Sequence, residues 1–135
     1  MKSDRVPSRG PNILPIDRSI LRILEEDVAD NDPDVMLELI DIFIHDSRWH
    51  LQEIAKVLEQ QEFRKIEISA HSLKSSSATF GAMALAGLSA RLEQLARDKK
   101  MEGIVELLYT AREEFARVEE ILMTERTKWV ETASK

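Results

Sequence analysis

The stretch SAHSLKSSSATFG, residues 69–81, decides the fold of this chain. Together with the residues just before it, the stretch predicts one amphipathic helix that ends at Gly81, because glycine tolerates the left-handed conformation in which many helices end. Apolar and small residues recur at spacings of three and four, which is the pattern of a helix with one face against a core. That stripe consists of Phe63, Ile66, Ala70, Leu73, Ser77 and Phe80.

His71 lies on the opposite side of the same helix. At about 100° per residue, it is roughly 130° from the centre of the apolar stripe and therefore points to solvent. Glu67 lies one turn before it, and Lys74 and Ser75 lie one turn after it. An exposed imidazole beside an ammonium group and small neighbours suits a nucleophile that a partner protein must reach. The alternative is an ordinary solvated histidine, in which case Lys74 is a solvated charge as well.

These residues resemble the histidine-containing phosphotransfer (HPt) family, and residues 70–74 with 79–81 are similar to the phosphotransfer domain of chemotaxis histidine kinases. The resemblance rests on His71, Leu73, Lys74, the small run Ser75–Ala78 and Gly81. It implies that His71 accepts a phosphoryl group and that Lys74 neutralises charge on that group. It also implies that Ser75 and Ala78 are small so that a partner surface can approach closely.

The resemblance further implies roles for two residues of the next helix. Glu93, twenty-two residues after His71, is the candidate to hold the second imidazole nitrogen and fix the tautomer. Arg97 matches a basic position of relay members and would help to dock the partner. The alternative for Glu93 and Arg97 is a plain surface pair four residues apart.

Ser75 departs from the family pattern, which usually has glycine directly after the lysine. Its hydroxymethyl group lies where the partner's active site must enter. Two functions therefore stay open. In the first, the chain carries a phosphoryl group between receiver domains, or from a histidine kinase to a response regulator. In the second, it is a module that docks response regulators without efficient transfer.

The rest of the chain predicts an all-α fold, an antiparallel up-down four-helix bundle with a short additional N-terminal helix. Short connections make successive helices antiparallel neighbours. Residues 1–12 are expected to be a flexible arm, 13–130 the bundle and 131–135 a C-terminal tail. The proline-containing start and charged tail favour a free-standing protein. The expected helices cover residues 17–29, 33–60, 62–80, 82–99 and 104–130.

Exposed apolar residues near His71 predict where a receiver lands. Ile68 lies on the outward side of the helix, where burial is not expected. Together with Ile13, Leu14 and Ile16 of the lead-in, it is expected to form a docking patch, since contiguous exposed apolar surface marks interaction sites.

Composition limits the remaining possibilities. The net charge of −6 argues against nucleic acid as a partner, and the absence of cysteine excludes thiolate chemistry. No apolar run is long enough to span a membrane, so we expect a cytoplasmic monomer. The resemblance implies response-regulator receiver domains and a hybrid or chemotaxis-like histidine kinase as partners. The chain has no nucleotide-binding motif, so we expect a phosphoryl-carrying intermediate rather than an enzyme.

No metal site is expected on this chain. The resemblance implies that magnesium takes part in the transfer and is held by the carboxylates of the receiver partner. Nothing in this sequence resembles a magnesium cage. A di-metal bundle enzyme is disfavoured because no histidine has a glutamate three residues before it.

Overall fold

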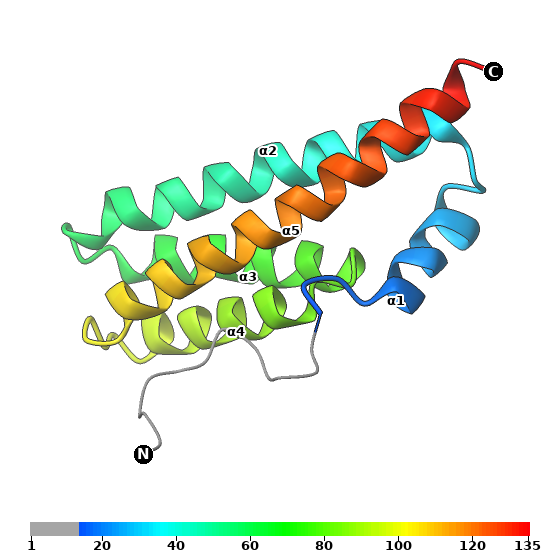
Figure 1. The fold of residues 1–135 in the computed structure, drawn as a ribbon. Helices are drawn as coiled ribbons and strands as arrows, with labels where there is room; N and C mark the ends of the chain where they lie inside the picture. Colours follow the sequence, from blue (N-terminus) through cyan, green and yellow to red (C-terminus); the bar gives the residue numbers. More distant parts are fainter. Residues whose placement is uncertain (1–13) are drawn as a thin grey trace.

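The computed structural model describes residues 14–135. They form an all-α fold in which four long helices pack as an antiparallel up-down bundle, with a short helical segment across one end (Figure 1). This confirms the predicted architecture. The helices are α1 (Arg18–Ile23), η1 (Leu24–Val28), α2 (Pro33–Leu58), α3 (Phe63–Thr79), α4 (Met83–Arg97) and α5 (Ile104–Ala133). None of the helices in this part of the chain is both long enough and apolar enough to cross a membrane.

The N-terminal segment differs from the single helix predicted for residues 17–29. Asp17 caps α1 as expected, because its carboxylate accepts the N–H of Ser19 at 2.9 Å. The chain then widens into the π-helix η1, in which the N–H of Ala29 donates to the carbonyl of Leu24 five residues before it. Asp30 and Asn31, which follow η1, have positive φ angles that short polar side chains tolerate.

The core lies between α2, α3, α4 and α5. The predicted stripe of α3 points into it, with Ile66, Ala70 and Leu73 completely buried. Phe80, at the end of α3, stacks on Phe43 of α2 with ring centroids 4.4 Å apart. Because these side chains fix the rotation of α3 about its own axis, the opposite face of α3 is held towards solvent.

The end of α3 is closed by a Schellman motif. The N–H of Ala82 donates to the carbonyl of Ser77 at 2.8 Å, and the N–H of Gly81 donates to that of Ala78 at 3.1 Å. Gly81 has φ +81°, as the sequence predicted. Its carbonyl in turn accepts the N–H of Asp17 at 2.8 Å, so the turn after α3 anchors the N-terminal segment.

Candidate functional site

His71 is presented to solvent from the middle of α3. Its side chain is 59% exposed, although Ala70 just before it and Leu73 two residues after it are buried. The Nδ1 atom lies 2.9 Å from Oε2 of Glu93 on the neighbouring helix α4. The structure therefore brings together two residues that are twenty-two positions apart, in the pairing that the resemblance implied.

Glu93 connects the site to two cations. Lys74 Nζ donates to Glu93 Oε1 at 2.7 Å, and Arg97 Nη2 donates to Glu93 Oε2 at 3.2 Å. The Glu93 side chain is only 9% exposed, so these contacts satisfy a carboxylate that is largely withdrawn from water. The hydrogen bond from Lys74 is the main reason that the pKa of Glu93 lies below its ordinary value of 4.5; burial opposes this shift and the contact with His71 supports it.

An ionised Glu93 determines the tautomer of the imidazole. A carboxylate can only accept hydrogen bonds, so the proton of a neutral His71 ring must be on Nδ1. The lone pair is then on Nε2, the ring nitrogen that Glu93 does not hold. The site consequently offers a nucleophilic nitrogen with a fixed ring orientation.

Glu67 extends this network, although no role was predicted for it from the sequence. Arg97 Nε donates to Glu67 Oε2 at 2.9 Å, so Arg97 links two carboxylates on different helices. This ion pair raises the pKa of Arg97. The position of Glu67 one turn before His71 was visible in the sequence, but its partner on α4 was not. Arg97 is therefore more than a surface partner of Glu93.

The small residues beside His71 leave the imidazole uncovered. Ser75 is exposed and Ala78 half-buried, and both follow His71 on the outer side of α3. The carbonyl of Ser75 accepts the Thr79 hydroxyl at 3.1 Å, whereas the Ser75 hydroxyl makes no hydrogen bond to another described residue. The Ser75 hydroxymethyl group is thus part of the surface that an incoming protein would meet.

The predicted docking patch is wrong at Ile16. Ile16 is only 1% exposed and belongs to the core; it precedes the cap Asp17 and, with the buried Leu21, occupies the positions of a hydrophobic staple. Leu14 is exposed, but its segment is anchored by the hydrogen bond from Asp17 to Gly81. At 1.5 Å per residue, Gly81 is about 18–20 Å along α3 from Ile68, so the anchor point lies far from that side chain. Ile13 and the arm predicted for residues 1–12 lie outside the described residues.

Ile68 itself is 51% exposed, as expected. An open hollow of about 360 Å³ lies between α2 and α3, on the side of Ser72. Its α2 wall includes Ile42, Asp46 and His50, which recur every four residues; that spacing is the signal by which the sequence could have revealed them. Burial lowers the pKa of His50, which favours a neutral imidazole in this wall.

No metal centre accompanies this site in residues 14–135, where no three His, Cys, Asp or Glu side chains come together as possible ligands. The three histidines are separated: His45 is exposed beside Asp46, and His50 lies in the hollow between α2 and α3.

Comparisons with known proteins identify the family of this chain. The Hpt domain pattern matches residues 38–121. Histidine-containing phosphotransfer protein 2 of Oryza sativa subsp. japonica is 32% identical over 85 residues, a match that covers 62% of this chain and 57% of the rice protein. The chain thus matches little more than half the length of this curated relative.

Solved structures extend the likeness to nearly the whole bundle. Histidine-containing phosphotransfer protein B from Pseudomonas aeruginosa PAO1 is 29% identical with a TM-score of 0.77, covering 88% of this chain and 98% of that one. A histidine-containing phosphotransfer protein from maize is 26% identical with a TM-score of 0.73, over 88% and 87% of the two chains. The family pattern spans more than half of the sequence and includes the exposed histidine, its lysine and the glutamate on α4, so the chain belongs to the Hpt domain family.

Proposed function

We propose that this chain carries a phosphoryl group on Nε2 of His71 between response-regulator receiver domains, or from a histidine kinase to a receiver. The observation that carries the proposal is the exposed imidazole whose Nδ1 is held by Glu93 at 2.9 Å. That contact leaves Nε2 as the nucleophile. The proposal includes no nucleotide site on this chain and places the magnesium ion of the reaction on the receiver.

The transfer step needs little from this chain beyond position and charge. The Nε2 lone pair attacks the phosphorus of an aspartyl phosphate; the N–P bond forms while the P–O bond breaks, and the aspartate carboxylate leaves with the electron pair. The phosphorylated ring retains its Nδ1 proton and is cationic, so the Glu93 carboxylate stabilises the product. In the onward step the next receiver's carboxylate attacks phosphorus, and the neutral imidazole is restored.

Lys74 has the second role. Its ammonium group lies one turn after His71 and is held by Glu93 at 2.7 Å, with the side chain 35% exposed. Phosphoryl transfer passes through a loose transition state in which charge is spread over the equatorial oxygens. A cation held beside the ring neutralises part of that charge, and Glu93 keeps it there before the receiver arrives.

A phosphotransfer assay tests the proposal against docking alone. The full chain is mixed with a receiver labelled on its aspartate with radioactive phosphate, and acid-labile label on the chain is measured. We expect label to move to the chain within the time that an active HPt control needs. If the receiver binds but label stays on it, docking is the better description; recovery of transfer in Ser75→Gly would then identify the hydroxymethyl group as the obstacle.

Replacing Glu93 with glutamine is expected to slow transfer about tenfold, because a charge-assisted hydrogen bond to the cationic ring becomes a neutral one. Receiver affinity should change little, since Glu93 is mostly buried. Single-turnover rates and a binding titration separate the two effects. Glu59→Gln removes the same charge from an exposed position at the end of α2 and serves as the control. An unchanged rate in a folded Glu93→Gln protein would exclude this role.

Replacing Ile68 with aspartate is expected to weaken receiver binding about tenfold or more, because a docked partner would bury a charge without a counter-ion. Folding should be unaffected, since half of the Ile68 side chain is already exposed. Titration with a receiver measures the affinity, and thermal unfolding checks the fold. Ile23→Asp is the matched control, because Ile23 is 56% exposed but lies on α1. Equal affinities for the two variants would remove Ile68 from the docking surface.

A further inference from the structure

The outer face of α5 carries a regular surface pattern that the phosphotransfer site does not use. α5 packs mainly against α2 and α4, diagonally across the bundle from α3. Its solvent side therefore points away from His71. Apolar side chains recur on that side every seven residues, at Tyr109, Ala116, Met123 and Val130, and all four are exposed.

A second row with the same period runs beside the apolar one. It consists of Glu106, Glu113 and Glu120, and all three are exposed. None of the three makes an ion pair with a described residue. In contrast, glutamates on the flanks of α5 are paired with cations: Glu119 with Arg48 and Glu125 with Arg18. Within residues 14–135, the fold thus neutralises these acidic side chains beside the face and leaves the row on it without a cationic partner.

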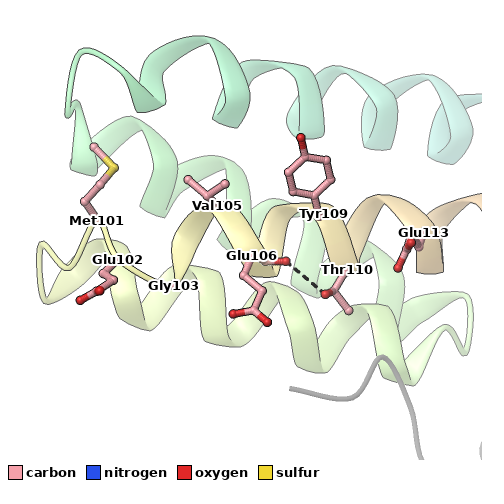
Figure 2. A pocket seen from close by; sticks show the side chains of 8 residues that line it. All are labelled: Met101, Glu102, Gly103, Val105, Glu106, Tyr109, Thr110 and Glu113. Carbon is pink, nitrogen blue, oxygen red and sulfur yellow. Dashed lines mark hydrogen bonds between the residues drawn. The ribbon is translucent and has the colours of Figure 1, made fainter. Parts of the chain in front are cut away.

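Two open hollows lie along these rows. The first, of about 680 Å³, is at the start of α5; Figure 2 shows Val105 and Tyr109 on one edge of it and Glu102 and Glu106 on the other. The second, of about 550 Å³, lies further along and includes Ala116, Glu120 and Met123. Every charged residue that lines either hollow is a glutamate.

We propose that the outer face of α5 binds a cationic amphipathic helix of a partner protein. An exposed apolar row that runs along a helix and is flanked by charges gives a partner helix apolar contacts and complementary charges along its length. The unneutralised glutamates select a partner with lysine or arginine beside its own apolar row. They disfavour a second copy of this chain, because two such faces would bring like charges together. Arg112 also lies on this face, but the three glutamates of the row outnumber it.

Such a partner would leave the phosphotransfer site open. A helix on the far side of α5 does not cover the imidazole on α3, so the chain can hold one protein on α5 while a receiver contacts His71. The inference rests on the surface of α5 alone and does not depend on transfer at His71.

A designed peptide tests the proposal directly. The probe has about three heptads, with leucine at the two core positions and lysine at the flanking positions, so that its own lysines oppose self-pairing. Its counterpart carries glutamate in place of each lysine. The full chain, labelled with ¹⁵N, is titrated with each peptide and amide shifts are mapped. We expect the basic peptide to shift the amides of residues 102–127, with an affinity that falls as salt is added, and the acidic peptide to bind far more weakly.

Two variants test the rows separately. Tyr109→Ser with Met123→Ser removes apolar contacts, and Glu106→Gln with Glu113→Gln and Glu120→Gln removes the charges; each set should weaken the basic peptide about tenfold. The matched control, Glu26→Gln with Asp27→Asn and Glu59→Gln, makes the same change in net charge at exposed positions outside α5. Equal weakening by the control, shifts centred elsewhere, or equal binding of the acidic peptide would overturn the proposal. Concentration-dependent dimerisation that Tyr109→Ser abolishes would assign the face to a second copy instead.

Discussion

The His71→Gln variant is expected to take no label from a phosphorylated receiver, a loss of at least about a thousandfold in transfer, because an amide nitrogen has no available lone pair. The fold should remain, since the side chain is 59% exposed and contributes nothing to the core. Glutamine also approximates the shape of the imidazole and can donate to Glu93. Loss of transfer in this variant would therefore report on the nucleophile rather than on the surrounding network.

His45→Gln provides the control for this experiment. His45 is a second exposed histidine whose side chain is 83% exposed on α2, where its contact is with the adjacent Asp46. We expect wild-type transfer in this variant, with label that is still acid-labile. Retention of label by His71→Gln, or its disappearance in His45→Gln, would show that the phosphoryl group is carried elsewhere.

The Gly81→Ala variant is expected to lower the free energy of unfolding by about 2–3 kcal/mol. Two effects contribute: a side chain in the left-handed region costs about 1–2 kcal/mol, and the new Cβ would lie 2.6 Å from the carbonyl oxygen of Asp17. Relief of that clash requires the Asp17 backbone to move away from Gly81, which breaks the hydrogen bond between them and costs a further ~1 kcal/mol. Urea denaturation measures the change.

Other helix ends in this protein separate the two effects. Gln61 and Lys99 occupy the corresponding positions after α2 and α4 with φ of 54° and 57°, and both carry full side chains. A glycine is thus not required by the turn itself; it is required after α3 because Asp17 packs against it. Faster hydrogen exchange in residues 17–29 of Gly81→Ala would show this loosening directly.

Gly87→Ala is the matched control for Gly81→Ala. Gly87 is exposed within α4, and apart from its chain neighbours and the adjacent helix backbone no atom lies within 4 Å of where its Cβ would be. Alanine is a better helix former by about 1 kcal/mol, so this variant should be slightly more stable than the wild type. A comparable loss of stability in both variants would contradict the close-approach explanation.

The sequence alone determined the helices and the side of α3 on which His71 lies. Spacings of three and four in Phe63, Ile66, Ala70 and Leu73 set the buried face, and the outward direction of His71 followed from helical geometry. Local signals also mark helix ends: Asp17 caps α1, Asp32 caps α2 just before Pro33, and Gly81 follows α3. These features depend on neighbours within a few residues, which is the range that a sequence pattern records.

The resemblance named Glu93 as a candidate, but only the tertiary structure placed its carboxylate beside the histidine. The contact between His71 and Glu93 depends on how α3 and α4 rotate against each other, and the link from Arg97 to Glu67 has the same origin. The burial of Ile16 was missed because Asp17 is held by Gly81, sixty-four residues away in the chain. The glutamate row on α5 could be recognised only from the packed structure, because packing shows which glutamates meet a cation on another helix in residues 14–135. A periodic pattern gives the direction in which each side chain leaves its own helix. The distance to a side chain on another helix is set only when the helices pack around the core.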